Sequence, residues 1–105
     1  MNATVRSNKG MTIVDVHGHI DLGTSPVLRK TMLESLKNGG GLAANLADVK
    51  YIDSSGIASL LEVLKEAKSK GKKFVLLGLT PAVREVLQLT RLTGVFEIHG
   101  SEDEL

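Results

Sequence analysis

The chain has 105 residues, 42% of them hydrophobic, and a formal net charge of +1, so we expect one domain with one core and no direct binding of nucleic acid. It contains no cysteine, which excludes disulfides and thiolate metal sites. No apolar run approaches the ~20 residues that cross a bilayer and no apolar leader opens the sequence, so we expect a cytoplasmic protein without membrane insertion.

The first residues predict a β-hairpin. A short strand is expected at residues 4–6, a turn at residues 8–10, and a second strand at residues 11–17 whose alternate side chains share one face. Residues 18–23 are predicted to form a loop.

A helix and a buried strand are expected next. Ser25 is a candidate N-cap and Pro26 fits the first helical position. Apolar residues then recur at helical spacing, at Leu28, Met32 and Leu36. Residues 42–46 are mostly apolar, which is typical of a strand buried on both faces of a parallel sheet, and residues 47–52 are interpreted as a short polar link. Asn45 needs a hydrogen-bond partner if it is buried.

The second half of the sequence repeats the alternation of helix and strand. A helix is predicted at residues 55–70, with an apolar face made by Ile57, Leu60, Leu61, Leu64 and Ala67. A buried strand is expected at residues 74–77, a helix beginning at residues 80–81, and a last strand at residues 95–98. Residues 101–105 are acidic and are expected to fray.

This alternation predicts an α/β fold. Helices that join buried strands through short links imply right-handed crossovers and a parallel portion of sheet. We therefore expect a mixed sheet of four to five strands, with parallel strands at its core, and three to four helices.

The patterns that would signal an enzyme or a metal site are absent. The glycines at residues 39–41 lie between a helix and a strand, the reverse of the order that a dinucleotide-binding turn requires. No G-x-S-x-G elbow surrounds Ser54 or Ser55. The three histidines have no third ligand at a metal-binding spacing. We predict no catalytic residue, no cofactor and no metal.

A cluster of lysines admits two interpretations. Only one acidic residue, Glu66, lies among Lys65, Lys68, Lys70, Lys72 and Lys73. Cations suit the end of a helix, so a solvated helix end is the favoured interpretation. The alternative is a docking patch for an acidic partner.

The tetrapeptide Asp53-Ser54-Ser55-Gly56 stands directly before the longer apolar helix. Its first three residues are all good N-caps, so on physical grounds alone helix capping is favoured. A serine at the start of a helix is also well placed to carry a phosphate, because backbone N–H groups and the helix dipole favour negative charge there.

The wider sequence resembles the signature of STAS domains, the family of anti-sigma factor antagonists and of related domains in sulphate transporters. The family pattern Leu-x-x-Val-x-x-Ile-Asp-Ser-Ser-Gly matches residues 46–56 position by position. Residues 18–21 are similar to the family's Gly-x-Ile/Leu-Asp loop, and residues 79–83 and 92–96 to its third helix and the exit from it. The resemblance covers about residues 3–100 and implies a single STAS-like domain.

The resemblance implies the function of an anti-sigma factor antagonist. In the family the serine directly after the aspartate is phosphorylated, and here that serine is Ser54. The implied partners are an anti-sigma factor that is also a serine kinase, and a phosphatase that reverses the modification. Binding by the unphosphorylated protein would free a sigma factor, and phosphorylation would break the complex. A weak homodimer is a further expectation.

The same resemblance gives partner-binding roles to Asp21, Asp53, Ser54, Ser55, Gly56 and Ile57. Asp53 would position Ser54 or contact the kinase. Gly56 would let the partner's backbone approach closely, or would only set the helix start. Asp21 would bring its loop beside Ser54, or would be an ordinary turn residue. Ser55 is expected to be a cap rather than the phosphate acceptor.

Two other functions stay open. A STAS-type accessory subunit of a membrane transporter, such as a lipid-transport ATPase complex, would bind its partner without phosphorylation. A scaffold subunit of a large stress-signalling assembly is the third hypothesis. A small kinase gene beside this one would favour the antagonist, and neighbouring transporter genes would favour the accessory subunit.

Overall fold

In the computed structural model, which describes residues 1–105, five strands form one sheet whose order, β1-β2-β3-β4-β5, follows the chain. The strands are β1 (Asn2–Asn8), β2 (Met11–Ile20), β3 (Gly41–Ile52), β4 (Lys73–Leu77) and β5 (Glu97–His99). The helices are α1 (Ser25–Ser35), α2 (Ser54–Ser69) and α3 (Pro81–Leu89), followed by a 3₁₀ turn at Glu102–Glu104. β1 pairs with β2 antiparallel and the other strand pairs are parallel. The predicted α/β fold with a mixed sheet is confirmed.

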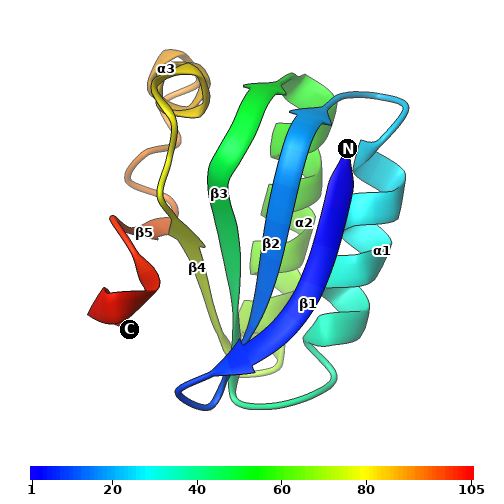
Figure 1. The fold of residues 1–105 in the computed structure, drawn as a ribbon, viewed down its shortest axis with the longest axis vertical. Helices are drawn as coiled ribbons and strands as arrows, with labels where there is room; N and C mark the ends of the chain where they lie inside the picture. The colour runs from blue at the N-terminus through cyan, green and yellow to red at the C-terminus, as the bar shows by residue number, and fades with distance from the viewer.

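The helices are distributed unevenly over the sheet. Figure 1 shows α1 and α2 side by side on one face of the sheet, whereas α3 lies apart from them, near the C-terminal half of β3. The predicted stripe of α1 is fully buried. On α2 the buried line is Ile57, Leu60, Val63 and Ala67. The prediction missed Val63, and Leu61 and Leu64 lie half-buried at the border of this line.

β1 spans Asn2–Asn8 and not only residues 4–6, and two further strands continue beyond their expected ends. β2 continues to Ile20, so the prediction of a loop was wrong for residues 18–20, and β3 continues to Ile52, so the predicted polar link is strand. The two extensions pair with each other, but the register shifts twice along them, once between Asp15 and His17 and again between Gly18 and His19. Such irregularities break the two-residue alternation by which a strand is recognised in a sequence.

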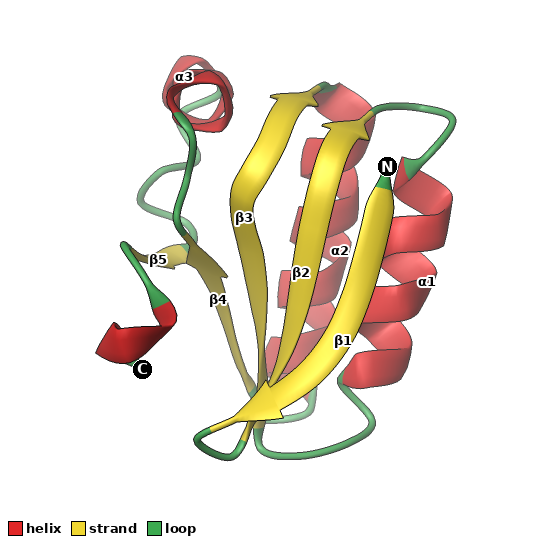
Figure 2. Ribbon diagram, viewed as in Figure 1, coloured by secondary structure: helices red, strands yellow, loops and turns green.

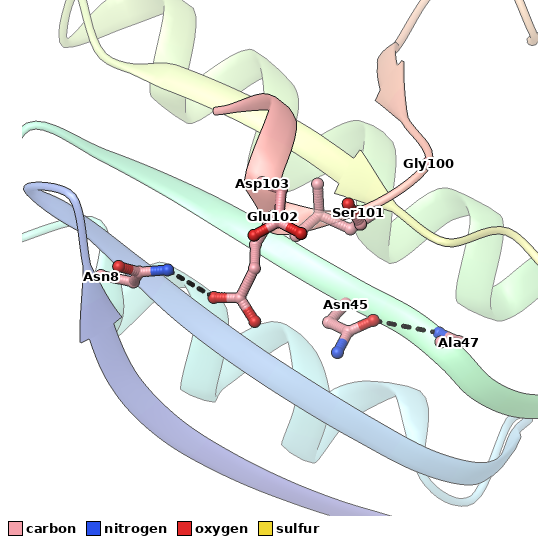
Figure 3. Close-up of a pocket in the computed structure, with 8 residues that line it drawn as sticks. Asn8, Asn45, Ala47, Gly100, Ser101, Glu102 and Asp103 are labelled. Atoms are coloured by element: carbon pink, nitrogen blue, oxygen red, sulfur yellow. Dashed lines mark hydrogen bonds between the residues drawn. The ribbon is translucent and has the colours of Figure 1, made fainter.

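The C-terminal residues pack on the sheet face that carries no helices, so the expectation of a frayed tail was wrong. Glu102 accepts hydrogen bonds from Arg6 Nη1 at 2.9 Å, Arg6 Nη2 at 2.8 Å and Asn8 Nδ2 at 2.6 Å. Arg6 also donates to Asp15, and Asp15 accepts from Asn45 Nδ2 at 2.8 Å, which gives Asn45 the partner it needs. Figure 3 shows Asn8 and Glu102 facing each other at this place. We call the Arg6–Glu102 contact the clasp.

The clasp holds a short segment over a small second core. Ile13, Ala43, Val75 and Leu77 form a separate buried cluster, against which Leu105 packs. These residues alternate along β2, β3 and β4 with side chains of the main core, so they point to the opposite face. The acidic composition of residues 101–105 therefore did not reveal that they are ordered, because the residues that hold them lie on β1, at the other end of the chain.

Acid is expected to release the clasp. Hydrogen bonds from Arg6 and then from Asn8 lower the pKa of Glu102 to about 2, from an ordinary value of 4.5. A carboxyl whose pKa is lowered by folding stabilises the fold above its ordinary pKa, and this stabilisation is lost as the pH falls from about 4.5 toward 2. We expect the protection factors of the amides in residues 101–105, measured by NMR hydrogen exchange relative to the intrinsic rate at each pH, to fall across this window, with β2 amides reporting global unfolding. In Arg6→Ala the tail should exchange fast throughout, and a wild-type tail that stays protected would contradict the prediction.

Candidate functional site

The candidate site lies at the edge of the sheet where β2 and β3 end. Ile20 and Ile52 are the last paired residues of these parallel strands, and the Asp53 N–H donates to the Ile20 carbonyl at 3.1 Å. α1 and α2 both begin at this edge, which Figure 2 shows at the upper ends of β2 and β3. The carboxyl ends of parallel strands are the usual location of functional sites in α/β folds.

Asp53 is the N-cap of α2. Its Oδ1 accepts hydrogen bonds from the Ser55 N–H at 3.0 Å, the Gly56 N–H at 3.3 Å and the Ser55 hydroxyl at 2.5 Å. The Ser55 hydroxyl, followed by these backbone groups, lowers the pKa of Asp53, so the carboxyl is ionised at neutral pH. The prediction that Ser55 is the cap was wrong. Asp53 has the extended backbone that a cap needs, and Ser55 is already inside the helix.

The two serines of the tetrapeptide have different environments. Ser54 is the first residue of α2 and is exposed, and its hydroxyl makes no hydrogen bond within the chain. Ser55 is half-buried, and its hydroxyl donates to Asp53. The Ser54 oxygen is therefore accessible from solvent without breaking a contact of the domain.

Asp21 orders the loop between β2 and α1. Its Oδ1 accepts from the Gly23 N–H at 3.0 Å and the Thr24 N–H at 3.1 Å, and Thr24 also bonds the His19 carbonyl. Thr24, and not Ser25 as predicted, is the N-cap residue of α1. The Leu22 backbone is among the groups that lower the pKa of Asp53, so this loop lies against the start of α2.

Gly56 and Ile57 lie beneath this surface. A Cβ on Gly56 would come within 2.6 Å of Ile52 Cγ1 and 2.7 Å of Ile20 Cγ2. Ile57 is 4% exposed and belongs to the main core. Both residues thus let α2 pack closely on β2 and β3. Direct contact of either residue with a partner stays a prediction.

Two exposed apolar side chains near the site were not predicted from the sequence. Leu22 is 76% exposed in the Asp21 loop, and Tyr51, two residues before Asp53, is 50% exposed and packs edge-on against His19. Both are large apolar side chains open to solvent beside the site. The sequence held one sign of this surface. A leucine lies between Asp21 and a glycine, and a loop does not need a leucine for its own stability.

Three of the five clustered lysines make polar side-chain contacts within the chain, whereas Lys65 and Lys68 make none. Lys70 pairs with Glu66, Lys73 pairs with Glu97, and Lys72 Nζ donates to the Leu36 carbonyl. No three potential metal ligands converge anywhere in the structure, and none of its helices is long and apolar enough to span a membrane. For Lys70, Lys72 and Lys73 these contacts favour the solvated helix end over a docking patch.

The site and fold together define a small α/β domain that presents a free serine at one sheet edge, at the start of a helix that an aspartate caps. The family model of the STAS domain matches residues 2–105, and the chain belongs to this family. An anti-sigma-B factor antagonist of Bacillus subtilis is 27% identical over 103 residues, which cover 98% of this chain and 94% of that protein.

Solved structures share the fold. An anti-sigma factor antagonist of Mycobacterium paratuberculosis has a TM-score of 0.89 at 25% identity, covering 98% of this chain and 88% of the other. SpoIIAA, a Bacillus cell fate determinant solved in its phosphorylated form, has a TM-score of 0.75 at 19% identity, covering 98% of this chain and 95% of the other.

Proposed function

We propose that this domain is an anti-sigma factor antagonist that releases its partner when Ser54 is phosphorylated. The observation that carries the proposal is the contrast between the serines: Ser54 is exposed with a free hydroxyl, whereas Ser55 is bound to the cap. The name of the Bacillus subtilis relative supports the antagonist over a transporter subunit.

The cap explains why a phosphate on Ser54 would act on a partner more than on the fold. The phosphate adds a charge of roughly −1.5 to −2 at pH 7. The dipole of α2 stabilises a negative charge at the N-terminus of the helix by about 0.3–1 kcal/mol. The Asp53 carboxylate already takes the Ser55 and Gly56 N–H groups. The phosphate therefore finds little left to bind within the domain, and its charge stays at the surface.

In this scheme the domain is a substrate and not an enzyme. The partner is an anti-sigma factor that is also a serine kinase and supplies the ATP, and its capture by the unphosphorylated domain frees a sigma factor in the cytoplasm. Leu22 and Tyr51 would be buried in that complex, together with the surface around Asp21, Asp53 and Ser54. A phosphatase restores the binding form.

Labelling with radioactive ATP and the candidate kinase tests the proposal. We expect label on the wild type and on Ser55→Ala, whose acceptor is intact, and none on Ser54→Ala. Undiminished labelling of Ser54→Ala would overturn the assignment of the acceptor. Binding of the kinase without any labelling would favour an antagonist that does not use phosphorylation.

A further inference from the structure

The outer edge of β1 carries backbone groups that point away from the sheet. Lys9 and Gly10 have φ of 54° and 80°, so they form a two-residue turn of the kind that joins adjacent antiparallel strands. Asn8 and Met11 flank this turn and are paired, so they exchange both hydrogen bonds. Because bonded and non-bonded pairs alternate along such a ladder, the N–H and C=O groups of Ala3, Val5 and Ser7 face outward.

These outward groups have no partner in the chain. No turn, loop or side-chain hydrogen bond reaches the backbone of Ala3, Val5 or Ser7. The Val5 side chain is 53% exposed. The strand, NATVRSN, has no lysine, proline or bulge, which are devices that commonly keep an edge strand from pairing. Its one charged side chain, Arg6, is engaged with Asp15 and Glu102 of its own chain.

We infer that β1 pairs antiparallel with β1 of a second copy of this chain, on a two-fold axis through Val5. In this register Val5 faces Val5 of the other copy and Ala3 faces Ser7, so each of the three outward residues donates one hydrogen bond and accepts one. The two Val5 side chains cover each other on the face of the sheet that carries the helices.

The sequence favours this register over its neighbours. Arg6, the one charged residue of the strand, lies opposite Thr4 of the other copy. A shift that centres the pair on Arg6 would place two arginines opposite each other, which is destabilising. A shift that centres the two strands on Thr4 would leave the outward N–H and C=O groups of Ser7 without a partner in the other copy.

The dimer would leave both copies of the candidate site accessible. Ser54 begins α2 at the end of β3, two strands away from the β1 edge, as Figure 1 shows. One particle would thus present two Ser54 surfaces, which strengthens binding to any partner that is itself paired. The inference does not depend on the function proposed above.

Single cysteines test the register, because the chain has none of its own. In Val5→Cys the two Cα atoms would lie about 5.5 Å apart, within disulfide range. In Thr4→Cys they would be offset by two residues and lie roughly 8 Å apart, beyond that range. Under a mild thiol oxidant we expect a covalent dimer of Val5→Cys and far less of Thr4→Cys or of Leu89→Cys, which samples random collisions at an exposed site.

Sedimentation velocity over a concentration series tests the association itself. We expect reversible dimerisation of the wild type, its loss in Val5→Lys, and its retention in Leu89→Lys, with circular dichroism confirming that the variants are folded. A wild type that stays monomeric at the highest concentration, or equal cross-linking at Val5, Thr4 and Leu89, would overturn the inference.

Discussion

Ser54→Asp is expected to abolish binding to the anti-sigma factor while the melting temperature changes by no more than a few degrees. The variant places a second carboxylate beside Asp53, which is already ionised. When the complex forms, the added carboxylate is taken out of water without a compensating charge, which costs several kcal/mol, and about 1.4 kcal/mol already corresponds to tenfold in affinity. Within the fold the change is small, because Ser54 is exposed at a helix N-terminus that tolerates negative charge.

Isothermal titration calorimetry against the partner, with thermal denaturation of the free domain, measures both effects. Ser54→Asn is the matched control, because it has the shape of aspartate without the charge, and it should bind more tightly than Ser54→Asp. Unimpaired binding by Ser54→Asp would sink the electrostatic mechanism. Equal loss in both variants would show that shape, and not charge, decides.

Gly56→Ala is expected to destabilise the domain strongly for so small a change. The added Cβ meets Ile52 and Ile20 at less than 3 Å, and both side chains are buried and held by their neighbours. Overpacking costs typically about 1–3 kcal/mol, which exceeds the roughly 0.5–1 kcal/mol that alanine gains over glycine in a helix. In a domain of this size each kcal/mol lowers the melting temperature by about 4–8 °C.

Gly94→Ala is the control, since its Cβ would have no neighbour within 4 Å and its φ is not in the left-handed region. Chemical denaturation should therefore show a clear loss for Gly56→Ala and almost none for Gly94→Ala. Equal stability of the two variants would contradict the packing argument. If Gly56→Ala were stable yet failed to bind, the role of Gly56 would be contact with the partner.

The sequence predicted the core elements well because their signals are local. The stripe of α1 needed only helical spacing, and the start of α3 at residues 80–81 needed only a polar residue before a proline. In the structure the Thr80 hydroxyl accepts from the Val83 N–H at 3.3 Å. The second half of β3 was missed because its identity depends on pairing with β2 across a register shift. The ordered tail was missed because the clasp joins Arg6 to Glu102.

The candidate site also has features that the sequence predicted and features that only the packed structure shows. Asp53 and the serines were found as a motif, but the choice of Ser54 over Ser55 came from the family resemblance. The structure adds a physical difference between them that no spacing contains, namely which hydroxyl the Asp53 carboxylate engages. The tight fit of Gly56 against Ile20 and Ile52 likewise appears only when three elements are packed together.

The order of the strands in the sheet has a consequence for synthesis. Since each strand lies beside its predecessor in the chain, a nascent polypeptide can add one strand at a time to an existing edge. All elements that position Ser54 are present once residue 69 has been made, whereas the segment that covers Ile13, Ala43, Val75 and Leu77 comes last. A chain that stops before residue 101 would thus carry a complete serine surface together with an uncovered apolar patch.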